Sequence, residues 1–136
     1  MNKKDLIAIR DFDPKDTNFI YDTWLNSLRH GNDLFGLIDN VRYYEVYRAV
    51  ITLLLKDATI KVACLKEDDQ IILGYSVSRG DTLDFAYVKE MWRKLGIFTD
   101  LLPLKIKTIT HLTKAGHAIW KKKFPDAIFD PFLGGA

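Results

Sequence analysis

One segment of the chain, residues 87–102, has residue types and a spacing that suit the binding of a phosphate group. An alternating strand ends near Val88, a short loop follows, and a helix begins near Gly96. The loop contributes the cations Arg93 and Lys94, and a helix start presents free backbone N–H groups that attract anions. A glycine allows the backbone to approach a ligand closely. The residues alone leave two interpretations open, an anion-binding loop and the commoner ordinary strand-to-helix turn.

The same segment resembles the acetyl-CoA-binding motif of the GNAT acetyltransferase superfamily, which is Gln or Arg, two residues, Gly, one residue, and then Gly or Ala. Arg93 matches the first position and Gly96 the second, whereas Phe98 stands where the family has a small residue. The order of the expected elements also resembles the GNAT order over nearly the whole chain. More narrowly, residues 23–27 and 73–75 make the chain similar to small GNAT-like proteins of phage and prophage genomes.

The resemblance implies direct transfer of an acetyl group from acetyl-CoA, the co-substrate, to an amine acceptor that the sequence does not identify. The pyrophosphate would rest on the backbone of residues 93–98, and the pantetheine would run along residues 85–88. The thioester would enter a V-shaped gap beside residues 104–112, where the N–H of Val88 would donate to its carbonyl oxygen. The implied cofactor-binding residues are Tyr87, Val88, Arg93, Lys94, Leu95, Gly96, Ile97, Phe98 and Thr113.

Acetyl transfer needs a neutral amine, so a base or a water chain must take its proton. The candidate catalytic residues are Asp84, His111 and His117. Asp84 lies on the motif strand and would reach an acceptor, although a solvated strand face is the alternative. Each histidine can titrate near neutrality. For both, the alternative is a surface or hydrogen-bonded structural role.

Trp120 occupies the position where many GNAT enzymes have a tyrosine that protonates the leaving thiolate. An indole N–H cannot act as this acid, so we expect Trp120 to be a core or pocket-wall residue. Trp120 and Phe98 together motivate an alternative function, a catalytically inactive GNAT-like binding or regulatory protein. Residues 121–123 are three lysines that we assign to a solvated helix end rather than to a nucleic-acid site.

The elements that must position these residues follow from apolar periodicity and from helix-capping residues. Asp13, Asp39 and Thr113 are expected to cap helices over residues 13–28, 39–54 and 113–120. A further helix is expected over residues 94–102, ended by Pro103. Strands are expected over residues 6–10, 59–65, 71–77, 82–88, 104–112 and 127–133. This order predicts an α+β fold with helices on both faces of a mixed sheet, and the resemblance implies that the sheet is GNAT-like and mostly antiparallel.

The composition limits the other possibilities. The 136 residues suit a single domain over residues 1–136, which the resemblance implies binds acetyl-CoA. A net charge of +2 does not favour a nucleic-acid partner. The lone Cys64 lies in an apolar strand and cannot form an internal disulfide. No histidine and cysteine spacing predicts a metal site, and no apolar run approaches the ~20 residues of a membrane span. We expect a cytoplasmic protein, in the host cytoplasm if it is phage-encoded; a monomer and a homodimer through residues 127–133 both fit.

Overall fold

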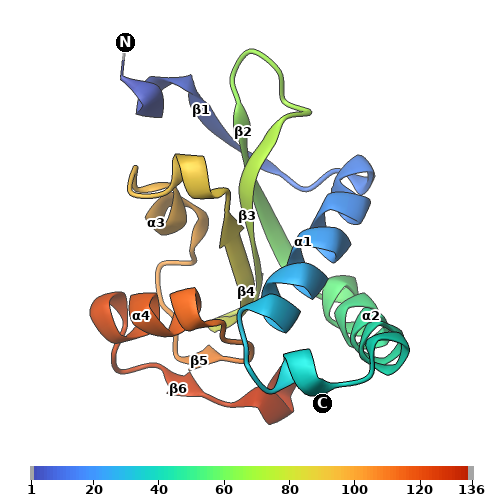
Figure 1. Cartoon of the computed structure of the whole chain (residues 1–136). Coiled ribbons are helices and arrows are strands. Elements are labelled where there is room, and N and C mark those ends of the chain that lie inside the picture. The colour runs from blue at the N-terminus through green and yellow to red at the C-terminus, as the bar shows by residue number, and fades with distance from the viewer. Residues whose placement is uncertain (1, 135–136) are drawn as a thin grey trace.

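The structure is a computed structural model that describes residues 2–134, so Met1, Gly135 and Ala136 of the expected domain lie outside the described residues. A six-stranded sheet with the strand order β1-β2-β3-β4-β5-β6 runs through the molecule (Figure 1). The first four strands are antiparallel, whereas β4, β5 and β6 are parallel to one another. The strands are β1 (Ile7–Asp11), β2 (Thr59–Leu65), β3 (Ile72–Arg79), β4 (Thr82–Val88), β5 (Thr108–Ile109) and β6 (Ile128–Phe129).

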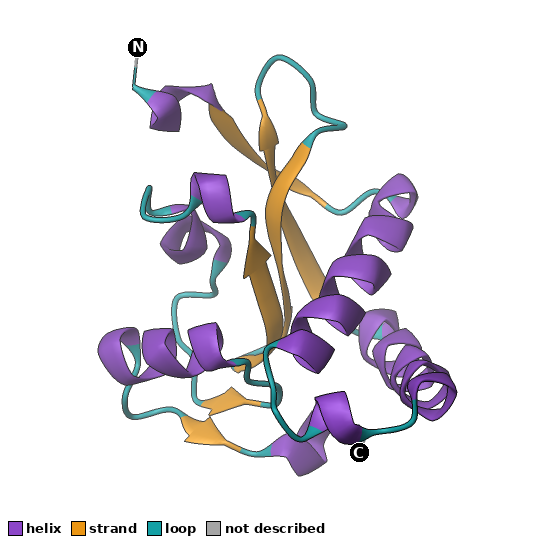
Figure 2. Cartoon of the chain, in the orientation of Figure 1, coloured by secondary structure: helices purple, strands orange, loops and turns teal. Residues whose placement is uncertain are grey.

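Helices cover both faces of this sheet (Figure 2), so the expected α+β fold class is confirmed. The α-helices are α1 (Thr17–His30), α2 (Asn40–Lys56), α3 (Ile97–Leu101) and α4 (Lys114–Lys123). Short 3-10 helices are η1 (Lys3–Leu6), η2 (Pro14–Asp16), η3 (Phe35–Leu37), η4 (Glu90–Trp92) and η5 (Pro131–Gly134). None of the helices within residues 2–134 combines the length and the apolar character needed to cross a membrane.

Two apolar cores lie on opposite faces of the sheet. On one face, Tyr75 and Phe85 pack against Trp24 of α1 and Ile51 of α2. On the other face, Ile97 and Leu101 of α3 pack against the sheet residues Ala63, Leu73 and Val88. The amphipathic pattern of α1 and α2 therefore positions one core, and the short α3 closes the other.

The expected helix caps are present. Asp13 accepts the N–H of Lys15 at 2.9 Å, Asp39 accepts that of Arg42, and Thr113 accepts that of Gly116 at 3.1 Å. These caps were predictable because each uses a side chain within three residues of the N–H that it satisfies. The first turn after Asp13 is a 3-10 helix, and α1 continues from Thr17.

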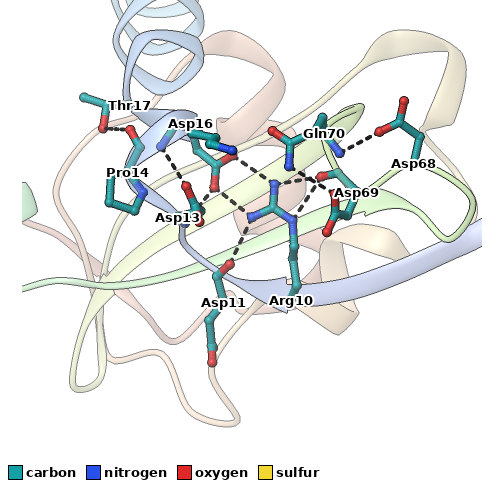
Figure 3. Close-up of polar contacts among 10 residues, drawn as sticks. Arg10, Asp11, Asp13, Pro14, Asp16, Thr17, Asp68, Asp69 and Gln70 are labelled. Carbon is teal, nitrogen blue, oxygen red and sulfur yellow. Dashed lines mark hydrogen bonds and ion pairs between the residues drawn. The ribbon is translucent and has the colours of Figure 1, made fainter.

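Arg10 ties the start of α1 to the sheet (Figure 3). Its guanidinium donates to both carboxylate oxygens of Asp16, at 2.8 and 2.9 Å, and to the carbonyl of Asp69 in the β2–β3 turn. Burial alone would raise the pKa of Asp16, but the hydrogen bonds from Arg10 and from the Asp13 N–H outweigh it and lower the pKa. The ion pair thus joins β1, α1 and a hairpin turn.

Three elements are shorter than the sequence predicts. The helix expected over residues 94–102 spans only Ile97–Leu101, because Lys94 and Gly96 adopt left-handed backbone conformations. The strand expected over residues 104–112 is only Thr108–Ile109, because β4 and β5 pair at two positions and then diverge. The last strand is Ile128–Phe129, and Pro131 begins a 3-10 turn after it.

Candidate cofactor-binding and active site

The C-terminal part of β4, after Leu83, has one edge that pairs with no other strand. Thr82 and Leu83 pair with β5, but the rest of β4 pairs only with β3. Lys89 donates its N–H to the Leu73 carbonyl at 2.8 Å, which marks a hydrogen-bonded position of the β3–β4 ladder. Bonded and non-bonded pairs alternate in an antiparallel ladder, so the N–H of Val88 points away from β3. The divergence of β4 and β5 leaves this donor facing open space.

Gly74 sets the close approach of β3 and β4 at this point. A Cβ atom on Gly74 would lie 2.5 Å from the Tyr87 carbonyl oxygen and 3.1 Å from the Cα of Val88. Any larger residue would have to displace the end of β4. The glycine therefore fixes where Val88 lies.

A cavity of about 570 Å³ lies beside the unpaired edge, a size typical of ligand sites. Its walls come from α1, β4, the loop after β4, the start of α3, the end of β5 with the segment after it, and one face of α4. The cavity is lined by Ser27, Leu83, Phe85, Ala86, Tyr87, Val88, Trp92, Arg93, Lys94, Gly96, Ile97, Phe98, Ile109, His111, Leu112, Thr113, Ala115, Gly116, Ala118, Ile119, Lys122, Lys123 and Phe124.

The loop between β4 and α3 presents backbone donors to one end of the cavity. Lys94 has φ 67° and Gly96 has φ 81°, and two left-handed residues so close together bend the chain sharply. Among residues 2–134, the backbone N–H groups of residues 94–98 form no hydrogen bond. Arg93 donates its Nε–H to the Val88 carbonyl at 2.9 Å and so folds the loop against the end of β4.

The charges on the cavity wall all have one sign. Its charged side chains are Arg93, Lys94, Lys122 and Lys123, and no acidic side chain within the described residues lines it. Lys123 also bonds the Thr99 hydroxyl at 2.9 Å, which ties the end of α4 to α3. This end of the cavity is suited to anions such as phosphate groups.

Sequence reasoning missed the two α4 lysines, because it assigned residues 121–123 to a solvated helix end. A usable signal was present: Lys122 and Lys123 follow Ile119 at three and four residues, so they share its face of the helix. Ile119 lines the cavity with them, whereas Lys121 does not.

Asp84 does not line the cavity. It is fully buried, and its carboxylate accepts two hydrogen bonds from Arg79, at 2.7 and 2.8 Å, and one from the Thr110 hydroxyl at 2.8 Å. A carboxylate held in this way cannot contact an acceptor directly, nor does it lie on the solvated strand face that was the alternative.

His111 lines the cavity, and its Nδ1 lies 2.9 Å from the Thr110 hydroxyl oxygen. Burial lowers the pKa of His111 from 6.5 to about 4, although the nearby Asp84 charge opposes this shift. The imidazole is therefore neutral at pH 7.

His117 and Trp120 lie outside the cavity wall and pack edge to face, with ring centroids 5.5 Å apart. The indole N–H of Trp120 donates to the Ala127 carbonyl at 3.0 Å, and so joins α4 to the segment before β6. Trp120 thus has a structural role in this structure.

Comparisons with known proteins support the fold. No family model matches the chain, and no curated protein matches it. Among solved structures it is similar to YjaB from Escherichia coli, with a TM-score of 0.51 and 18% identity over 71% of this chain and 61% of that one. This similarity agrees with the α+β fold described above.

Two further solved structures are a GCN5-related N-acetyltransferase from Rhodopseudomonas palustris and yncA from Salmonella typhimurium, the latter solved with its cofactor acetyl-CoA. Their TM-scores are 0.47 and 0.41, their identities 18% and 20%, and the matches cover 71% and 70% of this chain and 61% and 58% of theirs. The chain thus spans about three fifths of the length of these three structures. The narrower resemblance to phage proteins stays a prediction.

The fold brings most of the predicted site residues together. All but one of the predicted cofactor-binding residues line the cavity, and His111 lies there with them. The exception is Leu95, which packs with the apolar core under α3. Of the predicted catalytic residues, Asp84 lies behind the wall and His117 lies away from it.

Proposed function

We propose that this protein binds acetyl-CoA in the cavity beside β4 and transfers its acetyl group to an amine. The observation that carries this proposal is the divergence of β4 from β5, which leaves the Val88 N–H directed into a cavity of about 570 Å³. An extended pantetheine needs backbone partners along its length, and an unpaired strand edge supplies them.

The two ends of the cavity suit the two ends of the substrate. The unbonded N–H groups of residues 94–98 and the side chains of Lys94, Lys122 and Lys123 would receive the phosphates. The thioester would lie deeper along β4, where the Val88 N–H would stabilise the negative charge that develops on its carbonyl oxygen. His111 lines the cavity two residues after the end of β5.

A matched pair of lysine variants tests cofactor binding. Lys122 lines the cavity and Lys121 does not, although both are exposed on the same helix. Calorimetry should show that Lys122→Glu weakens acetyl-CoA binding by about tenfold or more, or at least 1.4 kcal/mol, and that Lys121→Glu changes it much less. S-acetylpantetheine, which lacks the phosphates, should bind both variants equally. Wild-type protein without sub-millimolar affinity for acetyl-CoA would overturn the proposal.

A second candidate function is binding of acetyl-CoA without turnover. Trp120 favours this function. Its N–H donates to the Ala127 carbonyl, and a tryptophan at this position cannot supply the tyrosine acid that many GNAT enzymes have there. Transfer assays with a panel of amines separate the two functions. Retention of acetyl-CoA with no acetylated product from any amine would favour the binding protein.

Cytoplasmic localisation and the choice between monomer and homodimer stay predictions. The edge strand β6 offers Ile128 and Phe129 to solvent, with exposed fractions of 67% and 41%, but only as a two-residue strand. Sedimentation of the purified protein would decide its oligomeric state.

A further inference from the structure

Four side chains form a continuous polar chain from the β3–β4 turn to the cavity wall. Arg79 donates to both oxygens of Asp84, at 2.7 and 2.8 Å, and the Thr110 hydroxyl lies 2.8 Å from one of the same oxygens. That hydroxyl also lies 2.9 Å from Nδ1 of His111. Asp84 and Thr110 are 0% and 1% exposed, so water does not compete for these bonds.

The hydrogen bonds among these four side chains allow one consistent arrangement of the protons. Both oxygens of Asp84 accept N–H bonds from Arg79, and one of them also accepts from Thr110, so the single Thr110 hydroxyl proton points at the carboxylate. The contact between Thr110 and His111 then needs a proton from the imidazole, which places that proton on Nδ1. Nε2 is then left with its lone pair and can accept a proton.

The surroundings of His111 determine from which kind of amine it can accept a proton. Trp24 of α1 and Tyr47 of α2 pack edge to face on its ring, at 5.5 and 6.2 Å, while Asp84 and Arg79 lie behind it. Burial holds the pKa of the imidazole at about 4, whereas an alkylammonium such as lysine has a pKa of about 10.4. So weak a base does not remove a proton from an alkylammonium at neutral pH.

The cavity wall gives a second reason to exclude a cationic acceptor. Its charged groups are the cations Arg93, Lys94, Lys122 and Lys123, and among the described residues no carboxylate lines it to pair with an ammonium. An amine that is already uncharged at neutral pH, such as an aromatic amine, needs no carboxylate partner in the cavity.

We propose that the chain Arg79–Asp84–Thr110 holds His111 as a neutral general base whose Nε2 takes the proton of an uncharged, weakly basic amine. This inference rests on the proposed function. The amine lone pair attacks the thioester carbonyl carbon, the new C–N bond forms and the C–S bond breaks. Nε2 accepts the proton released from nitrogen and passes it to the CoA thiolate, so the products are the amide and CoA thiol. Thr110 and Asp84 act through His111 and are positioning residues.

The first test needs no substrate. Nitrogen-15 NMR of the full chain at pH 7 should show His111 in the Nδ1–H tautomer, and Thr110→Val should abolish that preference. Thr108→Val is the matched control, because Thr108 lies two residues earlier, at the start of β5, and its side chain is outside the polar chain. An Nε2–H tautomer or an imidazolium in the wild-type protein would overturn the proposal.

The second test is kinetic. His111→Gln should lower kcat by about 10²-fold or more with an unchanged KM for acetyl-CoA, as loss of a general base does. Thr110→Val should lower kcat by about tenfold, since misorientation of a catalytic group costs up to about 10²-fold, and Thr108→Val should leave it unchanged. At pH 7 aniline should be acetylated faster than an alkylamine of similar size.

The two proposals fail in different ways. Acetyl-CoA binding together with faster transfer to alkylamines, or with full activity of His111→Gln, would overturn this inference and leave the proposed function standing. Absence of acetyl-CoA binding in calorimetry would overturn both.

Discussion

Mild acid should destabilise the folded protein through His111. Burial lowers the pKa of this imidazole from 6.5 to about 4, so the unfolded chain takes up a proton at a pH where the folded protein does not. Because the unfolded state then binds more protons, the free energy of unfolding falls as the pH decreases below 6.5. The stabilisation is fully present above pH 6.5 and is lost progressively down to about pH 4.

The size of the effect at pH 5 depends mainly on the unfolded chain. A pH of 5 lies 1.5 units below the ordinary value of 6.5, and each unit corresponds to 1.36 kcal/mol, which gives about 2 kcal/mol. Any folded-state pKa well below 5 gives nearly the same result.

Urea denaturation at pH 7 and pH 5 measures the effect. Wild-type protein should lose about 2 kcal/mol more than His111→Gln between the two pH values. His117→Gln also removes one imidazole, but from the outer side of α4, and should behave like the wild type. Equal losses for wild type and His111→Gln would refute the reasoning. As a readout that requires no variant, the NMR signals of His111 should not titrate between pH 8 and pH 5.

Three further changes test other parts of the structure. Gly74→Ala should displace the end of β4, weaken acetyl-CoA binding in calorimetry and cost about 1–3 kcal/mol in urea denaturation. Gly36→Ala, where the nearest atom would be 3.9 Å away, should do neither. Asp16→Asn should cost about 3 kcal/mol by leaving Arg10 unpaired, and should flatten the loss of stability below pH 4, because the lowered pKa of Asp16 stabilises the fold only while it is ionised. Trp120→Phe should cost about 1 kcal/mol through its lost hydrogen bond, with kcat unchanged, since a chemical role would lower kcat instead.

The sequence predicted those features that depend on short stretches of chain. The caps at Asp13, Asp39 and Thr113 are local, and so are the alternation that defines β2, β3 and β4 and the glycine that bends the loop before α3. The cavity-lining positions from Tyr87 to Phe98 followed from the same loop together with the GNAT resemblance. For this reason most of the cavity-lining positions of this loop could be predicted from the sequence.

Features that depend on partners distant in the sequence were not predictable. Residues 104–112 have a pattern typical of a strand, but their pairing ends where β4 and β5 separate, and no local pattern encodes that separation. Asp84 illustrates the same limit. Its position in an alternating strand suggested an accessible side chain, because neither its pairing with Arg79 nor the hydroxyl of Thr110 can be inferred from the β4 sequence.

Thr110 links the shape of the site to its chemistry. Its N–H makes a backbone bond to the Leu83 carbonyl at 3.1 Å, at the end of the β4–β5 ladder, and its hydroxyl bonds the carboxylate of the next β4 residue, Asp84. A side chain therefore continues the pairing where the backbone stops, and the following residue, His111, lies where the strands separate. A buried carboxylate is costly to retain unless its charge and all its hydrogen bonds are satisfied, as they are here. The same polar chain that fixes the imidazole thus also holds the point of divergence that opens the cavity, which is why a substitution at Thr110 should affect tautomer and catalysis together.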